Sequence, residues 1–312
     1  MTKMMTLSDA ARWLAERDRF CLLTHCRPDG DTVGSAAALC LGLRQLGKTA
    51  HLLKNQELAG NLSFLQEGLT VDAPAEGDLV VSVDVSTDDR LQPEAAGLPV
   101  DLKIDHHGSG NDFAPLALVD AGAGACGQII YDLLMELGVT LDCALATALY
   151  VAVSTDTGCF RFPNTSADSF RVAAACAATG ADLYPITRQL FDVNSLTKLK
   201  IQSWMVENTR FFREGKIALC AMPGQVEKDA TPDDMDGVAG FLRSIEGVEL
   251  CALIRETDTG VKLSVRCVPG YDASAICARF GGGGHKGASG AAFPMTLAEA
   301  EKAVEKVLME LY

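Results

Sequence analysis

Short apolar runs alternate with helical patterns over residues 1–180 of the chain. The apolar runs are bounded by turn or polar residues, which is typical of buried parallel strands; they cover Phe20–Thr24, Thr49–Leu53, Asp78–Val85 and Pro99–Ile104. Helical patterns separate or follow these runs at Thr32–Leu46, Gly127–Leu137, Cys143–Val153 and Ser166–Ala178. The alternation predicts an α/β fold built on a doubly wound, mainly parallel sheet, in which ligands bind beyond the carboxyl ends of the strands.

A long helical stretch separates this region from a second, smaller one. Asp182–Arg210 predicts one continuous helix that connects the two halves. Strand patterns follow at Lys216–Met222, Val248–Arg255 and Val261–Arg266, and helical patterns follow at Asp233–Ser244, Asp272–Phe280 and Thr296–Leu311. The sequence therefore predicts an N-terminal domain over residues 1–190, a helical linker over 191–213 and a smaller C-terminal α/β domain over 214–312.

The net charge of −14 narrows the ligands that this chain is expected to bind. Proteins that track long nucleic acid carry a basic stripe that displaces counterions from the phosphates. Here 41 acidic residues outnumber 27 basic ones, so we expect no binding of long duplex nucleic acid. A small anionic substrate stays compatible with the charge if metal ions and a few arginines reverse the local field.

The cysteines and the hydropathy of the chain indicate the cellular compartment of the protein. The eleven cysteines are scattered and form no CxxC pair, which is typical of core residues in a reducing compartment. No apolar stretch approaches the roughly 18 residues of a membrane span. The N-terminal pattern is charged and lacks the apolar region of a secretory signal. We therefore expect a cytoplasmic protein without a membrane partner.

Acidic and histidine side chains stand where two of the predicted strands end. His25, Asp29 and Asp31 follow the run Phe20–Thr24, and Asp84 interrupts a run of valines and leucines. Taken alone, the first group also fits a polar turn and Asp84 also fits a helix N-cap. A buried carboxylate is nevertheless costly unless it is paired or binds a cation.

Two further groups end a predicted strand and a predicted helix. Asp105, His106 and His107 follow the run Val100–Ile104, where histidines suit metal ligation, although a polar turn is the alternative. Asp156 ends an apolar helix and, by itself, fits an ordinary helix terminus.

Together the four groups predict one metal centre at a single sheet edge. A set of carboxylates and imidazoles without a thiolate suits Mn²⁺ or Mg²⁺ better than structural Zn²⁺, and the imidazoles favour Mn²⁺. We expect two divalent ions, Mn²⁺ first, with Mg²⁺ or Co²⁺ as alternatives. Two ions a few ångströms apart bind both the attacking water and the phosphate oxygens.

The C-terminal domain contributes a candidate phosphate site. A glycine-rich loop that includes Gly283, Gly284 and His285 follows a predicted helix, and consecutive glycines let backbone N–H groups approach an anion. It is not a Walker P-loop, because no GK[ST] follows the glycines. Arg266 ends a predicted strand and suits a phosphate clamp. The alternatives are a flexible turn for the loop and a surface position for the arginine.

These motifs resemble, in order and type and over essentially the whole chain, the DHH phosphoesterase family with its DHH-associated C-terminal domain. The length and the GGGGH sequence resemble the nanoRNase and pAp-phosphatase branch. RecJ exonucleases are similar in core motifs but larger, and family II pyrophosphatases end in a different, lysine-rich signature.

The resemblance implies a role for each candidate residue. One metal ion would be held by His25, Asp29 and Asp84, and the second by Asp31, Asp84, His106 and Asp156. It implies that His107 faces the substrate phosphate, and that Arg266 and His285, beside Gly283 and Gly284, contact the substrate from the C-terminal domain, which would close over it. Asp105 is expected to orient a histidine. Cys267 departs from the usual Arg-Ser pair, which leaves substrate choice open.

The resemblance implies hydrolysis of very short substrates by water that two metal ions activate. These substrates are RNA or DNA oligonucleotides of two to five nucleotides, including pApA, and 3′-phosphoadenosine 5′-phosphate (pAp). One alternative is a pyrophosphatase-like hydrolase of a small phosphoanhydride, and another is a non-catalytic nucleotide-binding module. The sequence leaves a homodimer open.

Overall fold

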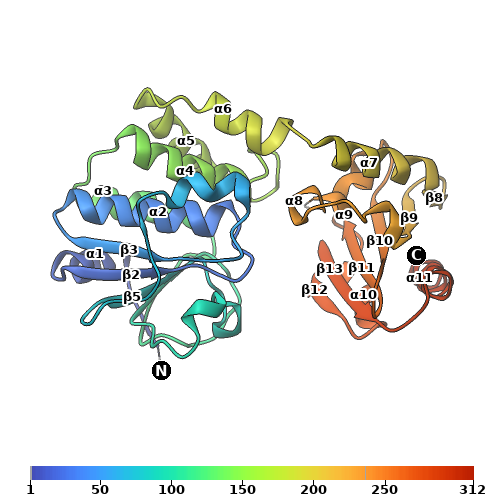
Figure 1. The fold of residues 1–312 in the computed structure, drawn as a ribbon, viewed down its shortest axis with the longest axis horizontal. Helices are drawn as coiled ribbons and strands as arrows, with labels where there is room; N and C mark the ends of the chain where they lie inside the picture. The colour runs from blue at the N-terminus through green and yellow to red at the C-terminus, as the bar shows by residue number, and fades with distance from the viewer. Residues whose placement is uncertain (1, 236) are drawn as a thin grey trace. The chain divides into compact units, whose positions relative to one another are not determined.

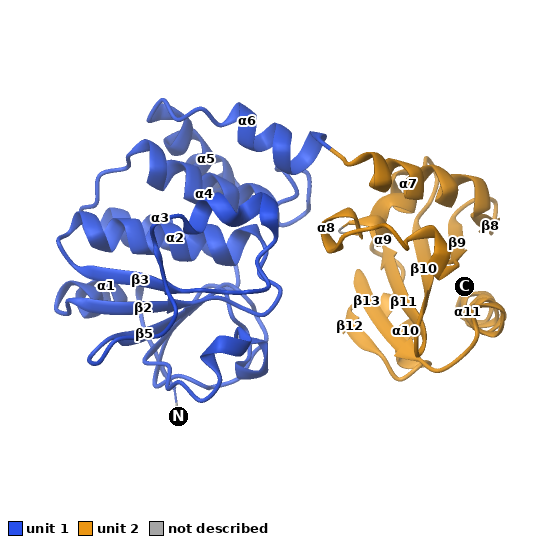
Figure 2. Cartoon of the chain, in the orientation of Figure 1, with its two compact units in different colours: residues 1–193 blue, residues 194–312 orange. Residues whose placement is uncertain are grey.

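The computed structural model describes residues 2–235 and 237–312, which form two compact units (Figure 2). The first unit spans Met1–Val193 and the second Asn194–Tyr312. Each unit has its own buried apolar core. In the described part of the chain, no helix combines the length and the apolar character needed to cross a bilayer.

A parallel sheet forms the centre of the first unit (Figure 1). Its strands are β1 (Lys3–Met4), β2 (Arg19–Leu23), β3 (Thr49–Leu53), β4 (Thr70–Val71), β5 (Leu79–Val83), β6 (Leu102–Asp105) and β7 (Leu116–Val119). They lie in the order β1-β7-β6-β5-β2-β3-β4, and every neighbouring pair is parallel. The parallel α/β fold predicted from the apolar runs is therefore confirmed.

The helices of the first unit are α1 (Leu7–Ala15), α2 (Gly30–Gln45), α3 (Cys126–Glu136), α4 (Cys143–Asp156), α5 (Ala167–Ala178) and α6 (Tyr184–Thr187), with shorter turns η1 (Gly60–Gln66), η2 (Asp88–Arg90), η3 (Pro93–Ala95) and η4 (Arg188–Asp192). The α-helices share a core with one face of the sheet, which includes Phe20 and Leu22 of β2. The other face, with Cys21 and Leu23, packs against the η2–η3 segment.

The direction of the winding reverses between β2 and β5. The chain passes from β2 through α2 to β3 on one side, and from β5 through η2 and η3 to β6 on the other. Such a reversal is where doubly wound sheets bind ligands. The second face carries 3₁₀ turns in place of the expected α-helices, because Pro93, Gly97 and Pro99 interrupt that segment.

A mixed sheet forms the second unit. Its strands are β8 (Arg210–Phe212), β9 (Ile217–Met222), β10 (Leu250–Thr257), β11 (Gly260–Cys267), β12 (Gly283–His285) and β13 (Ala288–Phe293), in the order β12-β13-β11-β10-β9-β8. Its helices and turns are α7 (Leu196–Asn208), η5 (Gly224–Val226), α8 (Pro232–Met235), α9 (Val238–Phe241), η6 (Leu242–Ser244), α10 (Ala273–Ala278) and α11 (Leu297–Leu311). Helices α10 and α11 cover one face, while α7 and α9 pack against β9 and β10 on the other.

Two predicted helices are interrupted in the structure. Asp182–Arg210 is not continuous: η4 ends before Val193, whose backbone is extended, and α7 starts afresh at a cap where Ser195 accepts from Lys198 N at 2.9 Å. The predicted helix Asp233–Ser244 divides at Gly237, which has φ 70°; residue 236 lies outside the described residues. Helix α7, from the predicted linker, is buried against the second unit through Ile201 and Met205.

Candidate metal centre

Three histidine or aspartate side chains follow three neighbouring strands of the first sheet. The strands lie in the order β6-β5-β2. His25 comes two residues after β2, Asp84 directly after β5 and His106 directly after β6. Because these parallel strands end at one edge of the sheet, Asp84 on the middle strand lies between the two histidines.

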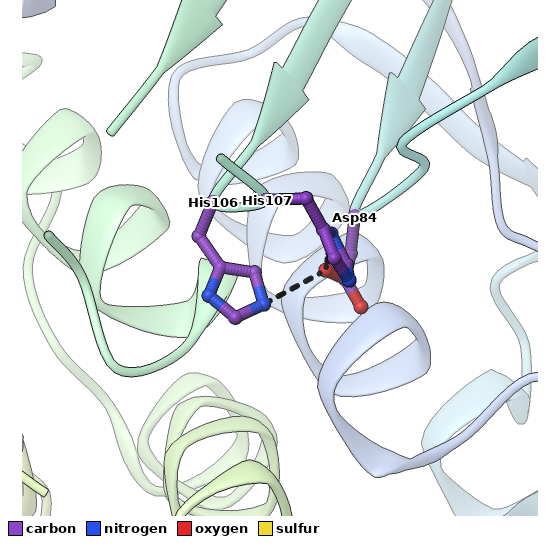
Figure 3. A group of neighbouring side chains, drawn as sticks. All are labelled: Asp84, His106 and His107. Carbon is purple, nitrogen blue, oxygen red and sulfur yellow. Dashed lines mark ion pairs between the residues drawn. The ribbon is translucent and has the colours of Figure 1, made fainter. Parts of the chain in front are cut away.

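The Asp84 carboxylate faces both histidines. Its backbone is left-handed at φ 60°, a conformation that costs a non-glycine residue roughly 1–2 kcal/mol. Its side chain is 3% exposed; Oδ1 lies 3.4 Å from His106 Nε2 and Oδ2 lies 3.8 Å from His25 Nε2. Figure 3 shows His106 and His107 both directed toward this carboxylate. Each Asp84 oxygen therefore serves a different part of the site.

The start of α2 supplies two more carboxylates. Asp29 is the N-cap residue and accepts from Asp31 N at 3.0 Å and Thr32 N at 3.2 Å. Asp31 accepts from the N–H groups that begin α3, Cys126 N at 2.6 Å and Gly127 N at 3.0 Å. Since helix N-termini stabilise negative charge, both carboxylates are held in fixed orientations.

The described residues contain three overlapping groups of candidate ligands. The ligand atoms within each group lie within 4.8 Å of one another; the groups are His25, Asp29 and Asp84; Asp84, His106 and His107; and Asp31, His106 and Asp156. His25 Nε2 lies 3.5 Å from Asp29 Oδ1. His106 Nε2 lies 3.8 Å from both Asp31 Oδ2 and Asp156 Oδ2. The structure thus brings together the six residues predicted as metal ligands.

The electrostatics of this cluster fit divalent cations. Among the described residues none donates a hydrogen bond to the buried Asp84 Oδ1, although His106 Nε2 lies 3.4 Å away. Burial and the neighbouring aspartates raise the pKa of Asp31 and of Asp84 well above the usual value, and burial raises the pKa of Asp156. Cations at this point would neutralise the repulsion, and oxygen and imidazole ligands without thiolate suit Mn²⁺ or Mg²⁺.

Asp105 and His107 form a hydrogen-bonded pair beside the cluster. The fully buried Asp105 carboxylate accepts from His107 Nδ1 at 2.7 Å and from the backbone N–H groups of His106 at 2.8 Å and His107 at 3.2 Å. This hydrogen bond raises the pKa of His107. The His107 side chain is 39% exposed and its Nδ1 lies 3.6 Å from Asp84 Oδ1. His107 is therefore oriented by Asp105 and accessible to a ligand.

Further side chains, which were not predicted, support these residues. Lys103, buried in β6, lies 3.1 Å from Asp105 Oδ2 and donates to Ser86 O at 2.7 Å; a lysine inside an apolar strand was the available signal. Below His25, Asn55 Nδ2 donates to His25 O at 2.9 Å, and Thr24 donates to Gln92 Oε1 at 2.9 Å. No sequence pattern marks Asn55 or Gln92, because their partners come from distant segments.

A pocket of about 170 Å³ lies over the cluster. Besides five of the candidate ligands, its lining includes His107, Ser86 and two arginines, Arg27 and Arg90. Neither arginine was predicted as a site residue, since exposed arginines outside the regular strands follow no periodic pattern. The pocket therefore joins a strongly acidic floor to cationic side chains.

The second unit places Arg266 and His285 on one face of its sheet. Arg266 on β11 pairs with Ala288 on β13, and Ala288 pairs with His285 on β12. Directly opposed residues point to the same side of an antiparallel sheet. Arg266 is half-buried and donates to Val265 O at 2.9 Å, while His285 is exposed. The two predicted substrate residues thus share a face that also presents small side chains.

The second half of the predicted glycine-rich loop is strand, which corrects the prediction for Gly283, Gly284 and His285. Gly283 and Gly284 pair with Gly290 and Ser289 as part of the edge strand β12. Gly284 has φ 142°, and a Cβ there would crowd the Ser289 hydroxyl and the Ala288 carbonyl. Glycine is needed because β12 and β13 approach closely at this point.

Cys267 lies on the opposite face from Arg266. It is buried in the apolar core, and its thiol donates to Lys286 O at 3.1 Å. Because successive strand residues alternate between faces, this side chain does not share a surface with Arg266. Ser264, two residues earlier on β11, does.

Comparison with known proteins places these features in a family. Residues 19–153 match the model of the DHH family, N-terminal domain, and residues 215–311 match that of the DHHA1 domain. The chain is 31% identical over 294 residues to the bifunctional oligoribonuclease and PAP phosphatase NrnA of Thermus thermophilus, covering 92% of this chain and 87% of that protein. It is 27% identical over 293 residues to NrnA of Bacillus subtilis, covering 91% and 92%.

Solved structures share the fold. An exopolyphosphatase-related protein from Bacteroides fragilis matches with a TM-score of 0.88 at 23% identity, covering 97% of this chain and 96% of that one. RecJ of Thermus thermophilus in complex with Mn²⁺ matches with a TM-score of 0.53 at 17% identity, covering 97% and 54%. The resemblance predicted from the motifs is confirmed: the chain belongs to the DHH family, in the branch of the NrnA proteins, and carries a DHHA1 domain.

Proposed function

We propose that this protein is a divalent-metal-dependent phosphoesterase that hydrolyses very short oligonucleotides and pAp. One observation carries the proposal: two groups of ligand atoms meet at Asp84, whose oxygens face different histidines. The names of the NrnA relatives, an oligoribonuclease and PAP phosphatase, support the substrate class.

We assign two divalent ions to the cluster, with Mn²⁺ as the first choice. His25, Asp29 and Asp84 would hold one ion, and Asp31, Asp84, His106 and Asp156 the other. When bound, the ions would activate a water molecule and neutralise charge on the phosphoryl group. The unpartnered Asp84 Oδ1 and the raised pKa values of the buried aspartates support this assignment.

His107 acts on the substrate phosphate in this proposal. Asp105 holds Nδ1, which leaves Nε2 of the half-exposed ring for a ligand. The hydrogen bond to Asp105 raises the pKa of His107 and favours the protonated ring. A protonated imidazole stabilises phosphoryl oxygens by hydrogen bonding, or protonates the leaving oxygen.

Arg266 and His285 supply nucleotide contacts in the second unit. Their shared sheet face also carries small residues such as Ala288 and Gly290, which leave room for a ligand. Because the net charge of the protein is −14, only a few phosphates of a substrate can contact positively charged side chains. This limits the substrate to short oligonucleotides and argues against long duplexes.

A substrate panel with Mn²⁺ tests the proposal. It comprises pAp, pApA, a five-nucleotide RNA, pyrophosphate and a long RNA, each incubated with enzyme and assayed for released phosphate or mononucleotide. We expect turnover of the first three and none of the last two. Turnover of pyrophosphate alone would establish a phosphoanhydride hydrolase instead. Binding of pAp without any turnover would establish a non-catalytic nucleotide-binding module.

A further inference from the structure

Two arginines line the metal-site pocket without ionic partners. Arg27 follows β2 and Arg90 ends the η2 turn after β5. Both side chains are exposed, and no ion pair joins either guanidinium to a carboxylate of the described residues. Asp88, close to Arg90 in sequence, is held instead by Asn111 Nδ2 at 2.8 Å. In a chain with 41 acidic residues, two unpaired arginines beside one pocket call for an anionic ligand.

The backbone fixes these two arginines close to each other. Cys26 N donates to Arg90 O at 2.7 Å, and His25 forms an isolated antiparallel bridge with Leu91. The loops after β2 and β5 are therefore tied together at the reversal point of the sheet. The arrangement links Arg27 and Arg90 directly to the segment that carries His25.

The backbone conformation of Arg27 indicates that its side chain must occupy a particular position in the pocket. Its φ of 51° is left-handed, which a non-glycine residue adopts at a cost of roughly 1–2 kcal/mol. Its N–H donates to Glu57 Oε2 at 2.7 Å, which offsets part of this cost. Residues held in such conformations cluster at ligand sites.

Charge balance indicates which anion these arginines receive. Two divalent ions carry four positive charges, which equal the negative charges of the four aspartates at the cluster. The four carboxylates would thus balance the charge of the two ions, which would then contact one phosphate at the reacting position. A second phosphate on the same molecule needs its own cations, and planar guanidinium groups bind phosphate through paired hydrogen bonds.

We propose that Arg27 and Arg90 form a binding site on the first unit for a second, non-reacting phosphate of the substrate. The inference rests on the proposed function and names a preference within it. Substrates with two phosphates, such as pAp and pApA, engage the arginines, whereas substrates with one phosphate do not. The first unit then discriminates by phosphate number, independently of Arg266.

The test compares substrates with one and two phosphates. We expect Arg90→Ala and Arg27→Ala each to lower kcat/KM for pAp about tenfold to a hundredfold, mainly through KM, as for loss of a charged hydrogen bond. For 3′-AMP and bis(p-nitrophenyl) phosphate, which lack the second phosphate, we expect a change below about threefold. Arg90→Lys keeps the positive charge but removes the planar guanidinium group with its paired donors. We therefore expect its kcat/KM for pAp to lie between those of wild type and Arg90→Ala.

Controls separate this inference from the proposed function. Arg12→Ala removes one positive charge from α1, outside the pocket, and leaves all three rates unchanged. Equal loss on pAp and on both single-phosphate substrates in the arginine variants would overturn the inference, as would no loss on pAp. A wild-type protein that fails to hydrolyse pAp would instead refute the proposed function itself.

Discussion

The two units place their functional groups in opposite ways. The first unit gathers aspartates and histidines from the ends of its strands and from helices α2 and α4. Its Asp84 has a left-handed backbone, and among the described residues no hydrogen bond reaches Asp84 Oδ1. The second presents Arg266 and His285 from within paired strands, on an exposed face with ordinary sheet register. Concentrated charge requires support from many segments, whereas a recognition surface follows from strand alternation. The first arrangement suits chemistry and the second suits binding.

The largest expected effect is loss of turnover on changing the first unit. Asp84→Ala removes the carboxylate that both proposed metal sites share, so we expect kcat to fall by about 10³-fold or more, equivalent to about 4 kcal/mol in the barrier. Steady-state rates on pAp and pApA with Mn²⁺ measure it. Glu76→Gln removes an exposed carboxylate elsewhere in this unit and serves as the control. Near-normal turnover by Asp84→Ala would mean that the cluster is not the reaction centre. The contrast between a catalytic first unit and a binding second unit would then be wrong.

Metal removal comes next in size and concerns the stability of the first unit. A chelated sample retains the repulsion among Asp31, Asp84 and Asp156, while each of two bound Mn²⁺ ions, at about 100 times its dissociation constant, adds about 2.7 kcal/mol of stability. For a unit of this size we expect Tm to rise by roughly 10–20 °C, measured by scanning calorimetry. The transition of the second unit should not move. A shift shared equally by both transitions would mean that the metal is not bound to the first unit alone.

A smaller effect is expected from the second unit. Arg266→Ala should raise KM for pApA about tenfold, near 1.4 kcal/mol, and leave hydrolysis of bis(p-nitrophenyl) phosphate less affected. Arg279→Ala, at an exposed position paired with Glu310, is the matched control. Equal losses on both substrates would assign Arg266 a structural or catalytic role and remove the contrast between the units.

The smallest effect sharpens the assignment of faces within the second unit. Cys267→Ser places a hydroxyl in the apolar core, so we expect unfolding free energy to fall by about 1 kcal/mol in urea titrations. Kinetic constants for pAp and pApA should stay within about twofold, because residue 267 does not share the face of Arg266. A change in KM with unaltered stability would show that this side chain reaches the ligand.

The sequence was most informative where a polar residue breaks an apolar pattern. Asp84 and the Asp105–His107 segment follow apolar strands, and a buried charge at such a point has few explanations. Parallel pairing then places these residues together, so their convergence was predictable.

Features set by tertiary contacts were not predictable. Strands β1 and β4 have two residues each and produce no periodic signal. The break between η4 and α7 depends on extended backbone at Val193 and Ser195 inside a helical pattern, and no local signal pairs Gly283 and Gly284 with β13. The proximity of Arg27 and Arg90 depends on the backbone hydrogen bond between their segments, which no local pattern in the sequence indicates.

The left-handed backbone of Asp84 has a consequence for laboratory evolution. Asparagine and glycine tolerate this conformation better than most residues, and both would remove one charge from a crowded anionic cluster. A selection for heat resistance in metal-free medium would therefore enrich these two residues at position 84. The selected variants would survive heating longer while losing the group on which the reaction centre depends. A thermal screen of this protein must therefore include an activity assay of every surviving clone.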